Sequence, residues 1–546
     1  MVRRTVLLLF AASVLCLTPG LRADESHATP NAEALAAVKA ADQLKTEGKF
    51  QDAASKYQDA LKLDKNMEAA QVGLAMALLR SGKLDAALDA ATAAFTSHPD
   101  SAPVMVVLGR VQFRLGDMGD AEEAYHAALQ IDSTNVDAYL GLAHLYRAYS
   151  LYAHAYAALK RAHDLDPHNP DIQLMWMQTL PRHDRLAVLE AYMSGLRQPS
   201  PGLQRYESYL KKTQDEPPHS CKVASNVEQT EIKLEPVHDP YPHIEGLGLE
   251  LKVNDRSHVL LLDTGASGVL ISRKAAEKAG LRHITDIAVG GIGDQGDRSG
   301  YLALADKIKV GSLEFHDCIV TVTNRASLTN SDADGLVGAD VFASFLVDLD
   351  LPHKVMRLSP LPKRPGDEEV VAKLDSEDQS DEPAVAAEST DNMPGEAYRP
   401  KDRYVAPDMK SWTTVLRFGH MLLVPTQLNA SKPLLFLLDT GAFQNTLSTH
   451  AARSTAKVDN SPMWIEGESG RVADVYRAEK VDIQFAHFHQ PNVNAVTFDM
   501  SNISHSVGTE ISGTLGFNLL SMLDIKIDYR DGLVDFVYRD RAGVTH

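Results

Sequence analysis

The sequence predicts a helical repeat array followed by two copies of one all-β domain. An Ala- and Leu-rich stretch from about residue 33 to 167 has apolar residues at helical spacing and repeats every 34 residues. Further along, LLLDTGASGVLIS at residues 260–272 returns as LFLLDTGAFQNTLS at residues 435–448. Each copy precedes an apolar-glycine element and an alternating strand that contains Asp350 or Asp528. These repeats predict a multidomain chain with an internal duplication.

Length and composition agree with several compact domains. The chain has 546 residues, of which 44% are hydrophobic, enough to give each domain a core. Its net charge of −19 argues against nucleic acid as a partner, because phosphates need basic surfaces. Much of that charge is local, since eleven acidic residues and one lysine lie between Asp367 and Glu396. We therefore predict an acidic disordered linker over residues 363–403.

The N-terminus has the layout of a secretory signal. Arg3 and Arg4 precede an apolar run at residues 6–17, and a small-residue cleavage point follows Ala23. A membrane anchor is the alternative, but the run is shorter than the ~20 residues that span a bilayer. Lipidation at Cys16 is not expected, because no small residue precedes it directly. We predict a signal peptide at residues 1–23, no integral membrane segment after its removal, and a periplasmic or secreted protein.

The helical third has an unbroken register over four units. Small residues recur at three positions of the 34-residue unit, where paired helices approach closely: Gly48, Gly82, Gly116 and Ser150; Ala53, Ala87, Ala121 and Ala155; Ala60, Ala94, Ala128 and Ala162. The pattern resembles tetratricopeptide repeats, with units at residues 34–67, 68–101, 102–135 and 136–169. The resemblance implies a concave groove for protein or peptide partners. A spacer or a dimerisation element is the alternative.

The segment at residues 170–226 is expected to close the array and lead to the β domains. Helices are predicted at about residues 171–180 and 186–196 as caps. Residues 198–225 contain several prolines and predict a mostly extended linker, with one short helix near residues 206–211.

In both β domains an acidic residue stands between two apolar runs. Each run predicts a strand, and Gly265 and Gly441 allow a tight turn between them. A carboxylate at such a place needs hydrogen bonds or a shared proton to offset its burial. Two such carboxylates face to face cannot both ionise, so the pair can act as base and acid together.

These residues resemble the Asp-Thr-Gly signature of retropepsin-like aspartic peptidases. It stands at Asp263-Thr264-Gly265 and again at Asp439-Thr440-Gly441. The resemblance implies two acid-protease barrels, at residues 227–362 and 404–541, and catalysis by Asp263 and Asp439 without metal or cofactor. Thr264 and Thr440 would link the two turns through hydrogen bonds. The substrate would be a peptide or protein.

Two glycine-rich stretches match the flaps of the family. Gly291 and Gly293 lie in the first, between predicted strands, and Gly467 and Gly470 lie in the second. A phosphate-binding loop is the alternative for the first, but it is not expected, because no helix follows it and no lysine stands at the required place. Neither stretch has the tyrosine of pepsin flaps.

The sequence is compatible with three arrangements. In the first, the two β domains pair within one chain. In the second, each β domain pairs with its twin from another chain. In the third, the protein is a non-catalytic periplasmic scaffold that binds partners. For a peptidase, Ala266 and Ala442 remove a hydroxyl donor that often follows this signature. Less stabilised carboxylates have a higher pKa, which predicts activity at mildly acidic to neutral pH.

Other reactive side chains are given no catalytic role. Cys221 and Cys318 either pair in an oxidising compartment or remain as thiols, and the sequence leaves both open. His487, Phe488 and His489 are expected at the surface, since no further ligands at suitable spacing predict a metal site. A short helix is expected at residues 273–279, ending at Gly280.

Overall fold

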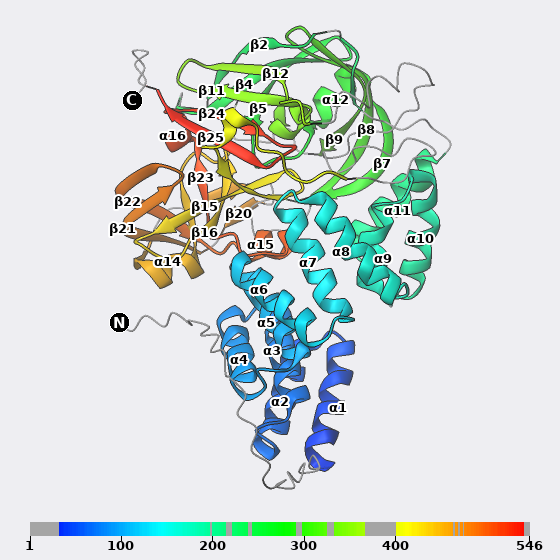
Figure 1. Cartoon of the computed structure of the whole chain (residues 1–546). Helices are drawn as coiled ribbons and strands as arrows, with labels where there is room; N and C mark the ends of the chain where they lie inside the picture. The colour runs from blue at the N-terminus through cyan, green and yellow to red at the C-terminus, as the bar shows by residue number, and fades with distance from the viewer. Residues whose placement is uncertain are drawn as a thin grey trace.

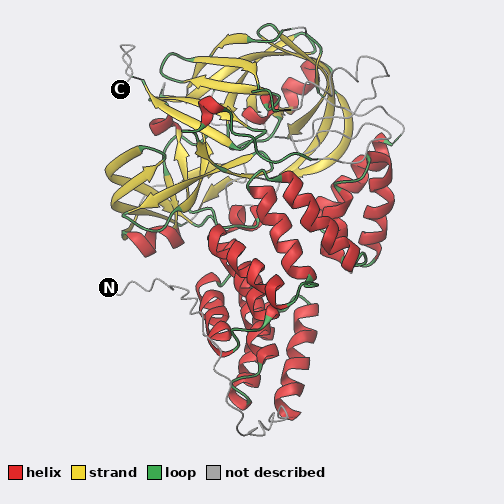
Figure 2. Ribbon diagram, viewed as in Figure 1, coloured by secondary structure: helices red, strands yellow, loops and turns green. Residues whose placement is uncertain are grey.

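A computed structural model gives the arrangement of the chain. It describes residues 32–196, 199–214, 221–225, 227–238, 243–290, 298–324, 332–365, 400–461, 465–467, 470–472 and 474–539. The helical array forms one end of the molecule and the β domains form the other (Figure 1). Figure 2 shows that helices dominate the first part and strands the second. The predicted fold class is confirmed, whereas the predicted signal peptide lies outside the described residues.

The array consists of four antiparallel helix pairs that match the four predicted units. The helices are α1 (Ala32–Thr46), α2 (Phe50–Leu63), α3 (Glu68–Arg80), α4 (Leu84–Ser97), α5 (Ala102–Leu115), α6 (Met118–Ile131), α7 (Val136–Ala148) and α8 (Tyr152–Leu165). Tyr57 and Tyr125 are buried between neighbouring helices, and an added Cβ at Gly109 would lie 2.8 Å from the Tyr125 ring. Gly109 therefore leaves room for an aromatic ring that helps to fill the array.

Three further helices extend the array, and one of them corrects the sequence prediction. They are α9 (Pro170–Met177), α10 (Arg182–Ser194) and α11 (Pro201–Thr213). We expected a mostly extended chain with one short helix near residues 206–211, but a 13-residue helix forms there. Pro201 occupies its first turn, where no backbone N–H is needed, and the Ser200 hydroxyl caps the N–H of Leu203 at 3.3 Å. The proline thus starts the helix.

The first β domain is a closed barrel. Its elements are β1 (Lys222–Val223), β2 (Thr230–Lys233), β3 (Glu235–His238), β4 (Ile244–Val253), β5 (Arg256–Asp263), β6 (Val269–Ser272), α12 (Arg273–Ala279), β7 (Arg282–Val289), β8 (Arg298–Val310), β9 (Leu313–Thr323), β10 (Gly335–Gly338), η1 (Ala339–Phe342), β11 (Phe345–Asp350) and β12 (Val355–Pro360). The strands β9-β6-β10-β5-β4-β8 form a ring that the β8–β9 pairing closes. Helix α12 has the predicted bounds.

The second β domain repeats this topology. Its elements are η2 (Pro407–Met409), β13 (Thr413–Thr414), β14 (Leu416–Phe418), β15 (Met421–Leu428), β16 (Leu434–Asp439), β17 (Thr446–Ser448), α14 (Thr449–Thr455), β18 (Lys457–Asn460), β19 (Ile465–Gly467), β20 (Gly470–Val472), β21 (Val475–Phe485), β22 (Phe488–Phe498), α15 (Ser501–Val507), β23 (Gly513–Gly516), α16 (Phe517–Leu520), β24 (Leu523–Asp528) and β25 (Leu533–Tyr538). Strands β22-β17-β23-β16-β15-β21 form the equivalent ring, which the β15–β21 pairing closes. Each strand of the first ring thus has a counterpart in the second.

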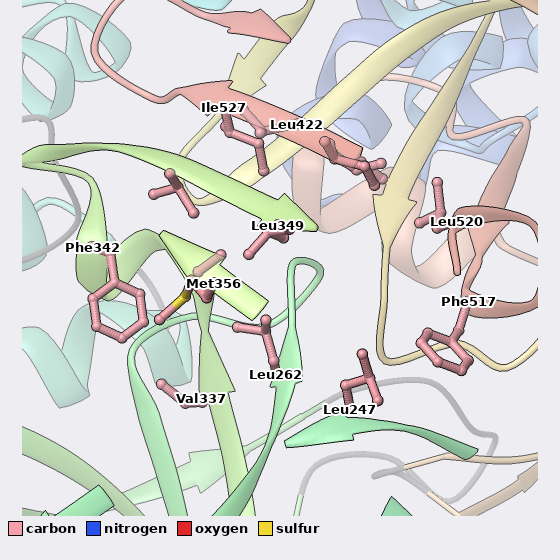
Figure 3. Close-up of a cluster of buried hydrophobic side chains, with 14 of the residues drawn as sticks. Leu247, Leu262, Val337, Phe342, Leu349, Met356, Leu422, Phe517, Leu520 and Ile527 are labelled. Carbon is pink, nitrogen blue, oxygen red and sulfur yellow. The ribbon is translucent and has the colours of Figure 1, made fainter. Parts of the chain in front are cut away.

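The two barrels share a third sheet. Its strand order is β13-β25-β24-β11-β12-β2, so β11 of the first domain pairs antiparallel with β24 of the second. Asp348 lies opposite Lys526 in this pairing, and Asp350 lies opposite Asp524. One hydrophobic cluster continues from barrel to barrel, and Figure 3 shows Leu262 and Val337 of the first domain in the same region as Leu422 and Ile527 of the second. A shared core and a shared sheet make the two β domains one folding unit.

The helical array contacts both barrels. Helix α11 lies against β7, where the Ser208 and Thr285 hydroxyls are 2.8 Å apart. On the second barrel, the backbone N–H of Glu510 donates to Arg114 O at 2.8 Å, and Met118 packs in a cluster with Leu435 and Leu437. The array is therefore fixed to both halves of the β unit.

Two further contacts organise the chain around the first barrel and the predicted linker. Cys221 and Cys318 form a disulfide, because pairing of β1 with β9 brings the two residues together. Residues 366–399 of the linker lie outside the described residues, but its two ends converge on Asp531. Arg364 pairs with the Asp531 carboxylate, and the N–H of Tyr404 donates to the same carboxylate at 2.9 Å. None of the helices in the described ranges is long and apolar enough to cross a membrane.

Candidate active site

The two Asp-Thr-Gly turns interlock at the junction of the barrels, within one chain. The Thr264 hydroxyl donates to Leu438 O at 2.8 Å, and the Thr440 hydroxyl donates to Leu262 O at 2.7 Å. Each hydroxyl also accepts from the backbone N–H of the other threonine, at 3.0 and 3.1 Å. All four groups are buried, so each bond forms away from competing water. The two threonine hydroxyls thus link the two turns through hydrogen bonds.

The position of each turn follows from the local sequence. Strands β5 and β16 end at Asp263 and Asp439, and each pairs in parallel with the later apolar-glycine strand, β10 or β23. The register sets Asp263 opposite Gly338 and Asp439 opposite Gly516. The twice-repeated glycine element therefore lies directly beside each aspartate.

Glycine is required at the third position because the carboxyl groups cross between the turns. A Cβ added to Gly265 would lie 2.9 Å from the Asp439 carboxyl carbon, and one added to Gly441 would overlap the Asp263 carboxyl group. Real side chains do not approach so closely. Gly265 and Gly441 thus leave room for the carboxylate of the opposite domain.

The two carboxyl groups lie within hydrogen-bonding reach of each other. The N–H groups of Gly265 and Ala266 donate to Asp263 Oδ1 at 2.7 and 3.1 Å, and those of Gly441 and Ala442 donate to Asp439 Oδ1 at 3.0 and 2.9 Å. Asp439 is buried and Asp263 is half-buried. The arrangement has near two-fold symmetry in its backbone donors.

Burial raises the pKa of both aspartates. For Asp439, burial and then the charge of Asp263 hold the pKa well above its ordinary value. For Asp263, burial also raises the pKa, but the Gly265 N–H, a hydrogen bond from Asp439 and the charge of His420 oppose the rise. A buried pair of this kind can hold one proton between its two carboxyl groups, which is the state that lets one group act as acid and the other as base.

Comparison with known families agrees with this geometry. A family model described as aspartyl protease matches the chain twice, over residues 249–341 and 424–519, and a tetratricopeptide repeat model matches residues 38–102 and 72–136. The two β domains are retropepsin-like aspartyl protease domains. The helical third is a tetratricopeptide array.

Individual relatives match parts of the chain. DNA damage-inducible protein 1 of Kluyveromyces lactis is 23% identical over 198 residues, which are 35% of this chain and 47% of that protein. The chain thus spans about half the length of this curated relative. A solved thermophilic TPR protein of Thermus thermophilus is 18% identical with a TM-score of 0.29, and the match covers 33% of this chain and 98% of that one. The Sgt2 TPR domain of Aspergillus fumigatus is 21% identical with a TM-score of 0.21, over 22% of this chain and 80% of that one.

The predicted flap residues of the protease domains fall differently in the two halves. Gly291 and Gly293 lie outside the described residues, between β7 and β8. Gly467 and Gly470 face each other at the ends of β19 and β20, which form a separate two-stranded hairpin. Gly467 and Gly470 thus lie on paired strands, and their role as a flap stays a prediction.

Sequence reasoning missed His420 and Arg417. His420 precedes β15, and its Nε2 lies 3.1 Å from Gly265 O in the opposite turn. Arg417 is 4% exposed, and its Nε donates to Gly419 O at 2.9 Å. The only sequence signal for His420 is its place at the start of the hairpin that delivers Asp439, which is not enough to predict a contact across the domain junction.

The remaining polar candidates lie away from the aspartate pair. His487 lies in the turn between β21 and β22 and His489 lies near the start of β22, and both are exposed as expected. Phe488 was also expected at the surface, but it is half-buried, because its ring stacks on Phe485 with the ring centroids 5.5 Å apart and packs against the hydrophobic core. Within the described ranges, no group of three or more His, Cys, Asp or Glu side chains is placed to hold a metal ion.

Proposed function

We propose that the protein is an aspartic endopeptidase in which Asp263 and Asp439 hydrolyse peptide bonds by activating water. The observation that carries this proposal is the pair of carboxyl groups held within hydrogen-bonding reach by interlocked turns. A buried pair that shares one proton is suited to take a proton from water and to give one to a carbonyl oxygen.

The same geometry favours a peptidase over a scaffold with relic turns. A turn that merely stabilised a fold would gain nothing from two carboxylates placed against each other, because their repulsion and burial cost free energy. Asn at either position would keep the backbone turn without that cost. The presence of both acids at this electrostatic cost supports a chemical role.

We propose that the tetratricopeptide array binds protein or peptide partners and that the protein works outside the cytoplasm, in the periplasm or as a secreted protein. The repeat family supports the first point. The N-terminal residues 1–23 support the second, and so does the Cys221–Cys318 disulfide, because disulfides persist in oxidising compartments.

The test is cleavage of a mixed peptide library by the purified mature chain, with and without a statine-type transition-state mimic. Asp263→Asn and Asp439→Asn, each alone, are expected to abolish cleavage, because one active site uses both acids. Partial loss in each variant would instead indicate separate sites built between chains. A folded wild-type protein that neither cleaves the library nor binds the statine compound would refute the proposal.

A further inference from the structure

We propose that His420 is a positioning residue of the aspartate pair, which selects Asp263 as the carboxylate and leaves the shared proton on Asp439. The inference rests on the proposed peptidase function and says which aspartate acts as the base and which as the acid. The two Asp-Thr-Gly turns are nearly equivalent in sequence and hydrogen bonding, so something outside them must decide which acid is charged.

The contact of His420 with the opposite turn fixes the orientation of its ring and shows which ring nitrogen carries a proton. Its Nε2 lies 3.1 Å from Gly265 O, and a carbonyl oxygen only accepts hydrogen bonds. Nε2 therefore carries the proton, and the imidazole is oriented against the turn that holds Asp263. In its protonated form the ring places a positive charge beside that turn.

The backbone that carries His420 is held from several elements. Gly419 adopts a left-handed conformation with φ +63°, and its carbonyl accepts from Arg417 Nε at 2.9 Å. Nη1 of the same buried Arg417 donates to Tyr529 O at 2.9 Å and to the Tyr152 hydroxyl of helix α8 at 3.3 Å. The position of His420 is thus built into the fold.

The register of the two barrels shows that this position differs between the halves. In the second domain Leu423 pairs with Leu437, and in the first Gly248 pairs with Leu261, each partner lying two residues before the aspartate. Counting back three residues from each of these positions gives His420, which precedes β15, and its counterpart Glu245, which lies in β4. The duplicated domains therefore carry a base at one turn and an acid at the equivalent place, which breaks their symmetry.

The charged surroundings of the pair agree with this assignment. Asp263 is faced by Asp439, whose hydrogen bond lowers the Asp263 pKa, and by His420, whose charge lowers it as well. Tyr529 is buried nearby. Burial and then the charge of Asp340 raise the pKa of its hydroxyl, the charge of Arg417 lowers it, and the charge of Asp263 raises it. Because the pKa is raised on balance, Tyr529 stays neutral. Asp439 receives no corresponding positive charge among its main influences.

A fixed charge state gives the reaction one direction. Water loses a proton to Asp263 while its oxygen attacks the peptide carbonyl carbon, and the carbonyl oxygen takes the π electron pair and the proton of Asp439. The resulting gem-diol is neutral, Asp263 is protonated and Asp439 is the anion. Collapse then returns a diol proton to Asp439 as the C–N bond breaks, and Asp263 protonates the leaving amine.

The experiment compares His420→Gln with the wild-type full chain and with His487→Gln, which changes an exposed histidine far from the pair. Glutamine keeps an N–H donor for Gly265 O and removes the charge. We expect the acid limb of the kcat/KM profile to move upward by about 1 pH unit in His420→Gln, because loss of a neighbouring cation raises the pKa of Asp263. His487→Gln should leave the limb in place. A uniform fall in kcat/KM with an unchanged limb would overturn the proposal.

A second measurement separates this inference from the peptidase proposal. The unfolding midpoints of wild type and His420→Gln are measured at a series of pH values from about 3 to about 8. This range spans the pKa values of carboxyl groups. The difference between the two proteins should change with pH, because it contains the attraction between the imidazolium and the Asp263 carboxylate. A pH-independent difference overturns the role of His420 whether or not the protein cleaves peptides, and absence of cleavage in the wild type overturns the peptidase proposal alone.

Discussion

Asp348 lies at the junction of the two barrels, and its substitution by Asn is expected to stabilise the protein at neutral pH. The Asp348 carboxyl is within hydrogen-bonding reach of Asp524, which is fully buried and pairs with Arg539 at 2.5 Å. Burial, and then Asp524 through a hydrogen bond and its charge, raise the pKa of Asp348 to about 7, although Arg357 acts in the opposite direction.

The sign of the pH dependence follows from where the proton is held. Between its ordinary pKa of 3.8 and about 7, Asp348 is protonated in the folded chain and ionised in the unfolded chain. Its contribution to the free energy of unfolding is therefore complete below about pH 4 and is lost as the pH rises through about 7. A shift of ~3 units corresponds to ~4 kcal/mol at most, and partial exposure of the side chain reduces this to about 2 kcal/mol.

Asp348→Asn replaces the protonated acid by an amide that still donates to Asp524 and never ionises. Urea unfolding followed by circular dichroism should give equal midpoints for variant and wild type at pH 4 and a higher midpoint for the variant at pH 8, by about 2 kcal/mol in free energy. Asp306→Asn, at an exposed position on β8, is the control and should show no such gain. A variant less stable than wild type at pH 8 would refute the assignment of the proton to this pair.

Three further predictions concern the aspartate pair. The raised pKa of Asp263 predicts that cleavage rises with pH above the range of an ordinary aspartate and peaks in mildly acidic to neutral solution; a kcat/KM maximum near pH ~2 would contradict it. Gly441→Ala should abolish cleavage and lower the thermal midpoint, because the new Cβ overlaps the Asp263 carboxyl group. Gly419→Ala is the control: its new Cβ has no atom within 4 Å, so it strains only its own backbone and should retain measurable cleavage. Thr264→Ala leaves the buried N–H of Thr440 without its acceptor and should cost about 1–3 kcal/mol in urea unfolding, while Thr264→Ser should restore most of it; equal loss in both variants would mean that the methyl group, not the hydroxyl, matters.

The sequence predicted the features that depend on local repetition. The 34-residue register located the helix pairs, because each unit packs only against its neighbours. The two Asp-Thr-Gly turns were equally visible, since the chemistry of the turn is contained in a few adjacent residues. Helix α11 is longer than the short helix expected near residues 206–211, because the stretch around Pro201 was interpreted as extended, although a proline in the first turn of a helix favours it.

Features that depend on contacts between distant segments could not be predicted in the same way. Strand β11 of the first domain pairs with β24 of the second. The alternating pattern of each strand is the same whether the strand pairs within its own domain or with the other domain, so the pattern does not predict this pairing. The role of His420 rests on a bond to a backbone carbonyl of the other domain, which carries no sequence signature. Cys221 and Cys318 are 97 residues apart, and only the β1–β9 register shows that they meet.

The convergence of both linker ends on Asp531 has a consequence for processing of the chain. Arg364 arrives before residues 366–399 and Tyr404 follows them, yet both bind the same buried carboxylate. The described residues of the two barrels are joined by a common sheet and a common core. A protease that nicks the stretch would yield a two-chain molecule whose halves stay associated, so the acids would remain paired after the covalent connection between them is gone.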